Sequence, residues 1–290
     1  MTTAWEGCKM QIVTMNVTQR CINKCLGCYA PRKGREMSVE NFEKIIKKIP
    51  PNIDSFVISG GEPFMHSNLD VIVKKARAWF NGTVGIFTSG VNGKNEYYEL
   101  KDIADHVDVF NVTLKFPYEK YDNEWFRNTK KNKKTIEFLE ECNRLGVRTN
   151  IHFSVDRRNI GFFYNMVWLA RKFNSELHVL RFLPFGGSEE ERMLALSDWE
   201  WDDFCRRIHK IEGVRIVFPS DYSYRICTAG VKRMHVFVNG DVSGCIYLET
   251  AKYVVGNLLK QDFNEIISLL EGWRSAFPLK RCIAKDGLKY

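Results

Sequence analysis

The chain has 290 residues and is 44% hydrophobic, which suffices for one large α/β domain with a small appendage but leaves little room for a second catalytic domain. Its 43 Lys and Arg residues against 35 Asp and Glu give a formal charge of +8, which mildly favours an anionic substrate, cofactor or partner without indicating nucleic acid. The N-terminus lacks the basic and apolar regions of a signal peptide, and no segment approaches the roughly 18 uninterrupted apolar residues of a membrane span, so we expect a cytoplasmic protein with no membrane partner.

Apolar, β-branched runs alternate with segments of helical period along the first 212 residues, a pattern typical of repeated βα units around a parallel sheet. Strands are predicted at Gln11–Val17, Ser55–Ser59, Val84–Thr88, Val107–Leu114, Val147–Val155 and Leu177–Leu183. Helices are predicted at Val39–Lys48, Leu69–Phe80, Glu96–Ala104, Lys134–Leu145, Phe162–Phe173 and Asp198–Ile211, with Ser38 and Ser197 as N-caps. Because eight units normally close a barrel, six predict an open, partial (β/α)6 barrel with its site at the C-terminal ends of the strands.

The pattern changes after Glu212, where the helical period gives way to shorter elements. Strands are predicted around Val214–Val217, Met234–Val238 and Val242–Ile246, with Asn239-Gly240 as a hairpin turn and a helix near Phe263–Leu270. We therefore expect residues 1–212 to form the partial barrel and residues 213–290 to form a small α+β extension.

The nine cysteines indicate metal binding or buried thiols, because a reducing cytoplasm keeps most disulfides open. Cys21, Cys25 and Cys28 form C-x3-C-x2-C directly after the first predicted strand. Three thiolates on one tight loop can ligate three irons of a [4Fe–4S] cluster and leave the fourth iron open. The alternative is a zinc site, which usually requires a fourth Cys or His ligand at short spacing. No such residue is close in sequence, since the next histidine is His66.

The stretch from Asn16 to Tyr29 resembles the start of radical S-adenosylmethionine (SAM) enzymes, particularly the branch with SPASM or twitch C-terminal extensions. The resemblance implies that SAM chelates the open iron and that Cys21, Cys25 and Cys28 are the catalytic ligands. It also implies that an electron from a flavodoxin- or ferredoxin-like reductase cleaves SAM to a 5′-deoxyadenosyl radical, which abstracts a substrate hydrogen. Gly27 departs from the family, which usually has an aromatic residue just before the third cysteine.

Gly60-Gly61-Glu62-Pro63 follows the second predicted strand. Paired glycines permit close approach of a ligand, and the carbonyls exposed there can accept hydrogen bonds from an ammonium group. The tetrapeptide alone is only a turn, but its place one βα unit after the cysteine loop matches the family motif that contacts the SAM amino group. The match implies SAM binding by Gly60, Gly61 and Glu62. Because the cysteine loop belongs to the preceding βα unit, we expect that Gly61→Val would not affect that loop directly.

Three further residues are candidates for binding SAM or the substrate. Ser89, after the third strand, resembles a family position whose hydroxyl faces SAM, although a plain turn is the alternative. Asn150, on the fifth strand, is expected to face the cavity. Arg181 opens a segment that resembles the Arg-x-x-Pro-x-Gly of these relatives and would bind a carboxylate or phosphate, unless it forms an ordinary interior ion pair.

Cys227, Cys245 and Cys282 lie in the extension, and their order with Asn239-Gly240 resembles a trimmed SPASM/twitch segment. Such segments hold auxiliary [4Fe–4S] clusters, so three ligands imply one auxiliary cluster at most, with a fourth iron position for substrate, water or another ligand. The alternative is three small buried hydrophobic side chains. That packing interpretation is preferred for the remaining candidates, Cys8, Cys142 and Cys205.

The resemblance implies a radical SAM enzyme whose substrate is a peptide or a small anionic molecule. One alternative is a GTP 3′,8-cyclase-like enzyme of cofactor biosynthesis, but its C-x2-C pair is absent and its Gly-Gly tail is replaced by Leu288-Lys289-Tyr290. The other alternative is a non-enzymatic iron–sulfur redox or sensor protein, against which Gly60 to Glu62 argue.

Overall fold

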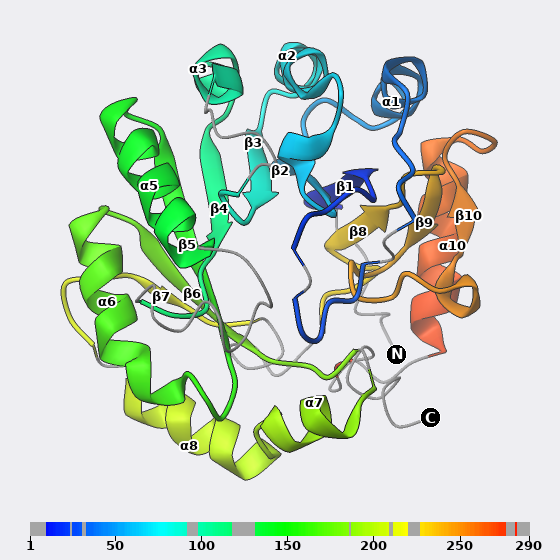
Figure 1. Ribbon diagram of the computed structural model, residues 1–290. Coiled ribbons are helices and arrows are strands. Elements are labelled where there is room, and N and C mark those ends of the chain that lie inside the picture. The colour runs from blue at the N-terminus through cyan, green and yellow to red at the C-terminus, as the bar shows by residue number, and fades with distance from the viewer. Residues whose placement is uncertain are drawn as a thin grey trace.

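The computed structural model describes residues 10–23, 25–30, 33–91, 98–117, 131–185, 187–208, 211–219, 227–276 and 282. In this part of the chain, one ten-stranded sheet has the order β10-β9-β8-β1-β2-β3-β4-β5-β6-β7. Figure 1 shows α1, α2, α3, α5 and α6 along the outer side of the curved sheet, with the blue segment that follows β1 on the opposite side from α1 to α3. The sheet is not a closed barrel, because β10 and β7 are its two ends.

The six predicted βα units are confirmed, with ends that differ by a few residues. Their parallel strands are β1 (Ile12–Thr18), β2 (Ser55–Gly60), β3 (Thr83–Thr88), β4 (Val109–Thr113), β5 (Arg148–Val155) and β6 (Glu176–Arg181). The predicted helices correspond to α1 (Val39–Ile46), α2 (Leu69–Trp79), α3 (Tyr98–Ala104), α5 (Lys131–Arg144), α6 (Phe163–Lys172) and α8 (Asp198–Ile208). The first two residues of the predicted Glu96–Ala104 helix lie outside the described residues.

Side-chain capping explains where several helices begin. The Ser38 hydroxyl accepts a hydrogen bond from the amide of Asn41 at the start of α1, as predicted. Ser197 and Glu200 cap the start of α8 reciprocally. The short helix α7 (Glu189–Leu194), with Ser188 as its N-cap, was not predicted, because it has too few turns to give a clear helical period.

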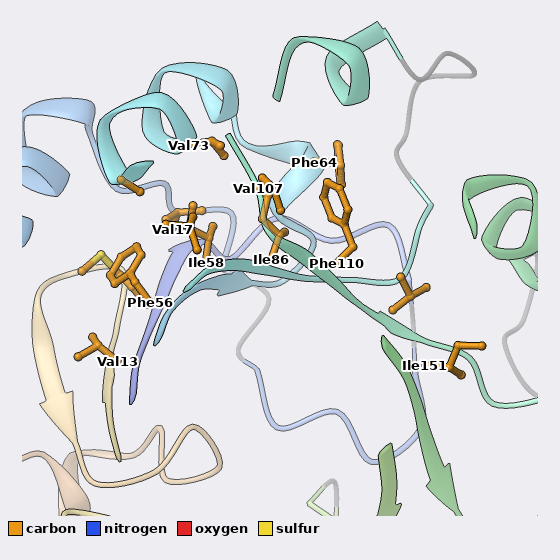
Figure 2. Close-up of a cluster of buried hydrophobic side chains, with 14 of the residues drawn as sticks. Val13, Val17, Phe56, Ile58, Phe64, Val73, Ile86, Val107, Phe110 and Ile151 are labelled. Carbon is orange, nitrogen blue, oxygen red and sulfur yellow. The ribbon is translucent and has the colours of Figure 1, made fainter. Parts of the chain in front are cut away.

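The main core lies between the sheet and the outer helices. Figure 2 shows part of it, with Val13, Phe56 and Ile86 among the labelled strand residues. The Phe56 and Phe80 rings stack with a centroid separation of 4.3 Å. Since side chains alternate across a strand, the residues between these core positions, such as Asn16 and Asn111, face the concave side. The concave side is therefore lined in part by buried polar groups.

The C-terminal strands continue the same sheet at both edges instead of forming a separate layer. Strand β7 (Ile216–Val217) pairs in parallel with β6, and β8 (Arg233–Val236) pairs in parallel with β1. Strands β9 (Asp241–Ser243) and β10 (Gly256–Asn257) follow in antiparallel order, and α10 (Phe263–Ser275) extends beyond the predicted helix end. The Asn239-Gly240 turn joins β8 and β9 as predicted, with Gly240 at φ 85°. The division of the chain at residue 212 stays a prediction.

None of the helices in the described ranges is both long and apolar enough to span a membrane.

Candidate functional site

The loop after β1 brings Cys21, Cys25 and Cys28 together. The pKa of the Cys21 thiol is raised to about 11, mainly by burial; a backbone hydrogen bond at Asn23 opposes the rise, and the nearby Glu62 carboxyl and the Cys25 and Cys28 thiols add to it. These mutual electrostatic effects place the three sulfurs in one neighbourhood. A thiol with such a high pKa keeps its proton at neutral pH, so metal binding there must displace protons. A donor set of three clustered thiols fits a [4Fe–4S] cluster with one open iron.

Gly27 is required by the packing of this loop. Its φ is +67°, and a Cβ on it would lie 2.4 Å from the Phe182 ring. The Gly27 amide donates to the Glu191 carboxylate of α7 at 2.8 Å. The aromatic ring beside the cluster loop is therefore supplied by Phe182 from the end of β6. The departure from the family sequence at Gly27 thus has a compensating residue far along the chain.

The glycine-rich turn is joined directly to the cysteine loop. The Gly61 amide donates to the Thr18 carbonyl at 2.7 Å, and the Glu62 amide donates to the Arg20 carbonyl at 2.8 Å. A Cβ on Gly61 would lie 2.3 Å from the Arg20 oxygen and 3.0 Å from Cys21 Cβ. A side chain at Gly61 would therefore press directly on the cysteine loop, because that loop is the surface against which Gly61 packs.

Glu62 forms a buried hydrogen-bond network that reaches the cysteine loop. Its carboxylate accepts from the Thr88 hydroxyl at 2.6 Å and from the Ser89 amide and hydroxyl at 2.8 and 2.5 Å. Burial raises the pKa of Glu62, and these hydrogen bonds oppose that rise. The Asn23 side chain, between Cys21 and Cys25, donates to the Ser89 hydroxyl at 2.9 Å. Glu62 and Ser89 thus tie together the ends of β2 and β3 and the cysteine loop.

Asn150 and Arg181 lie in different surroundings. Asn150 is buried on β5 and donates to Asn111 Oδ1 at 3.1 Å, while its own side-chain oxygen has no hydrogen-bond partner among the described residues. Asn111 Oδ1 also lies 3.2 Å from His152 Nε2. Arg181 pairs with Asp198 at 2.7 Å and donates to the Leu196 carbonyl, so its guanidinium is engaged at the start of α8.

The three cysteines of the extension also form one group. Burial raises the pKa of the Cys245 thiol to about 12, a backbone hydrogen bond at Tyr247 lowers it, and the neighbouring Cys282 and Cys227 thiols raise it. Cys245 and Cys282 pack in a small hydrophobic cluster around Leu248. This second group of thiols fits an auxiliary cluster. Cys142 and Cys205 are fully buried, in agreement with the packing interpretation, and Cys8 lies outside the described residues.

Three aromatic rings link the two groups of cysteines. Tyr29, next to Cys28, lies 5.1 Å from Tyr247 and 6.1 Å from Phe185, measured between ring centroids. Tyr247 and Phe185 stack at 5.1 Å. The Tyr29 hydroxyl is hydrogen-bonded to Ser59 at the end of β2. The extension is thereby packed against the cluster loop at the C-terminal ends of the strands.

Two residues in this region carried no sequence signal. Glu249 bonds to Gln19 and accepts from Asn16 Nδ2 at 3.2 Å, and burial raises its pKa to about 7. His235, on β8, is 1% exposed, and neither of its ring nitrogens has a hydrogen-bond partner in the described part of the chain. Burial lowers the pKa of His235 to about 3, so this ring is neutral at physiological pH. No motif surrounds either residue, so only the fold could identify them.

In the described ranges, no group of three His, Cys, Asp or Glu side chains is placed to share a single metal ion. Cluster ligands differ from ligands of a single ion, because each thiolate binds its own iron and the sulfurs need not converge on one point.

An open, largely parallel sheet with a thiol loop and a glycine-rich turn at the ends of β1 and β2 fits an α/β iron–sulfur enzyme. The chain belongs to the radical SAM superfamily, whose family model matches residues 15–160. Residues 227–275 match the SPASM iron–sulfur cluster-binding domain. Membership implies SAM and a [4Fe–4S] cluster as cofactors, and the second match implies auxiliary iron–sulfur clusters.

Comparisons with individual proteins agree with this assignment. A probable GTP 3′,8-cyclase of Sulfurisphaera tokodaii is 23% identical over 98% of this chain and 96% of its own length. Among solved structures, Streptococcus suis SuiB bound to S-adenosylmethionine has a TM-score of 0.71 and 16% identity, covering 94% of this chain and 67% of SuiB. Native anSMEcpe with bound AdoMet and Kp18Cys peptide has a TM-score of 0.74 and 15% identity, covering 94% and 86%. At these identities the two structures establish the fold alone.

Proposed function

We propose that this protein cleaves SAM reductively and uses the product radical to abstract a hydrogen atom from a bound substrate. When bound, the [4Fe–4S] cluster supplies one electron to SAM, which yields methionine and a 5′-deoxyadenosyl radical. The products would then be 5′-deoxyadenosine and a substrate that has lost one hydrogen atom. Cys21, Cys25 and Cys28 would hold the cluster, and a flavodoxin- or ferredoxin-like reductase in the cytoplasm would provide the electron.

The observation that carries this proposal is the direct joining of the cysteine loop to the Gly60-Gly61-Glu62 turn. The Arg20 carbonyl accepts from the Glu62 amide at 2.8 Å, so a ligand held by the turn lies next to Cys21. Gly60 and Gly61 would present backbone groups to the SAM methionine, while Glu62 and Ser89 keep the turn and loop in position. Asn150, whose side-chain oxygen has no hydrogen-bond partner among the described residues, would accept a hydrogen bond on the concave side of the barrel.

Arg181 is a weaker candidate than the sequence suggested. Its guanidinium already pairs with Asp198 and the Leu196 carbonyl, so binding SAM or substrate would require it to exchange these partners. Glu249 is a better candidate for handling protons. It lies near Tyr29, and its pKa of about 7 lets it hold or release a proton near neutral pH.

The auxiliary cluster would be held by Cys227, Cys245 and Cys282, with its fourth iron position available to the substrate or another ligand. The substrate itself is proposed to be a peptide or a small anionic molecule. GTP cyclisation is a second candidate, because curated relatives covering 98% of this chain are probable GTP 3′,8-cyclases. The C-x2-C pair noted above as missing argues against that candidate.

The test is anaerobic incubation of the reconstituted protein with SAM and dithionite, followed by measurement of 5′-deoxyadenosine. Formation of 5′-deoxyadenosine is expected in the native protein and lost in a variant with Cys21, Cys25 and Cys28 replaced by Ala. Cys142→Ala is the matched control, since it removes a buried thiol away from the site and should retain activity. Undiminished cleavage in the triple variant would disprove the proposal. A parallel reaction with GTP separates the second candidate, which requires a cyclised nucleotide product.

A further inference from the structure

The last turn of α10 places a charged side chain fully inside the protein. Arg274 is 0% exposed and belongs to the largest fully buried side chains of the described residues. Its Nη2 donates to the Cys227 carbonyl at 3.0 Å. Its Nε and Nη1 have no hydrogen-bond partner, and no carboxylate in the described ranges forms an ion pair with it. Among the described residues, two of its donors and its positive charge therefore have no acceptor.

Such an arrangement is strongly unfavourable unless an anion completes it. Removing a cation from water carries a large desolvation penalty, which only close counter-charge and hydrogen bonds offset. The C-terminal end of α10 contributes a partial negative charge, but helix carbonyls do not occupy Nε or Nη1 here. The unfilled donors are therefore available to an anionic group.

The surroundings of Arg274 identify where that anion lies. Cys227, whose carbonyl Arg274 contacts, is one of the three cysteines of the extension. The neighbouring Trp273 packs so closely that a Cβ on Gly230 or Gly244 would lie 2.9 or 2.5 Å from its ring. Gly244 precedes Cys245, and Gly230 donates to the Gly244 carbonyl at 3.1 Å. The end of α10 is therefore packed directly on the two chain segments that carry Cys227 and Cys245.

We propose that Arg274 is the internal counter-charge of the auxiliary iron–sulfur cluster, donating hydrogen bonds from Nε and Nη1 to cluster sulfides or cysteine thiolates. This inference rests on the proposed auxiliary cluster at Cys227, Cys245 and Cys282. Arg274 is a positioning residue that acts on the cluster and touches no substrate. Thiolate-ligated clusters are anionic and gain negative charge on reduction, so a nearby guanidinium stabilises the reduced form more than the oxidised form.

The parent for the test is the full chain with Cys21, Cys25 and Cys28 replaced by Ala, in which only an auxiliary cluster can assemble. The test compares this parent with the same protein carrying Arg274→Met. Each protein is reconstituted with ferrous iron and sulfide, and the reduction midpoint is followed by electron paramagnetic resonance. Arg274→Met should shift the reduction equilibrium at least tenfold toward the oxidised cluster, about 59 mV for one electron. Arg274→Lys should restore part of the shift. Arg206→Met, an exposed change on α8, controls for net charge and should leave the midpoint unchanged.

A second measurement separates this role from simple packing. In the metal-free protein the buried cation lacks its anion, so Arg274→Met should unfold at the same or higher denaturant concentration than its parent. After reconstitution the order should reverse, with faster loss of iron from Arg274→Met. An unchanged midpoint with full iron, or equal destabilisation with and without metal, would overturn the assignment to Arg274. If the parent with Arg274 intact takes up no iron, the auxiliary cluster itself is wrong, and the inference fails with it while SAM cleavage stands.

Discussion

Replacing Gly61 with Ala tests how the glycine-rich turn supports the cysteine loop. The new Cβ would lie 2.3 Å from the Arg20 oxygen, a separation that real Cβ atoms do not tolerate. The chain must relax by opening the contact between the turn and the loop, which strains the bond from the Gly61 amide to the Thr18 carbonyl. Overpacking of this kind costs about 1–3 kcal/mol. The relaxation also displaces Cys21, whose Cβ lies 3.0 Å from the added atom.

Gly82→Ala is the matched control for this change. A Cβ on Gly82 would lie 2.1 Å from the Ile53 carbonyl oxygen, an equally severe clash next to the N-terminal start of β3, at the opposite end from the cysteine loop. Denaturant unfolding of the metal-free proteins should show a comparable loss of stability for both variants. Iron content and cluster absorbance after anaerobic reconstitution should fall only in Gly61→Ala.

The opposite pattern would refute this reasoning. If Gly61→Ala retains a full cluster and loses only SAM affinity in an anaerobic titration, the glycine serves the cofactor alone. If both variants lose the cluster equally, general destabilisation explains the result, and the contact with Cys21 has no special importance.

Three further outcomes are expected. The variant with Cys21, Cys25 and Cys28 replaced by Ala should still bind iron through the extension, and iron analysis showing about none in a folded protein would contradict this. Burial lowers the pKa of His235 to about 3, so the metal-free native protein should lose on the order of 4 kcal/mol of stability as the pH falls from about 6.5 to about 3. His235→Phe should remove this loss. Parallel stability profiles for the two proteins over that range would refute it. For Glu249 the sign is reversed, because its pKa is raised to about 7. The stability of the native protein should fall as the pH rises from about 4.3 to about 7, and Glu249→Gln should reduce this pH dependence in denaturant titrations.

The sequence by itself determined the features that are local along the chain. C-x3-C-x2-C places Cys21, Cys25 and Cys28 on one loop whatever the rest of the fold does. The strands were predictable because their buried side chains follow patterns typical of a buried sheet: alternation at the start of β1, around Val13, and a continuous apolar run in β2, around Phe56. The Asn239-Gly240 hairpin was predictable for a similar reason, since its two residues alone favour the turn geometry.

Only the tertiary structure decided contacts between segments that are distant in sequence. The Asn16–Glu249 hydrogen bond joins residues 233 positions apart, and the raised pKa of Glu249 comes from burial that this joining creates. Phe182 fills the space beside Gly27, and Gly61 packs on Cys21, because strands that end at one edge of a sheet bring their loops together. The buried charge of Arg274 likewise emerges only when α10 packs on Cys227, since desolvation belongs to a position in the fold and not to a residue in a sequence.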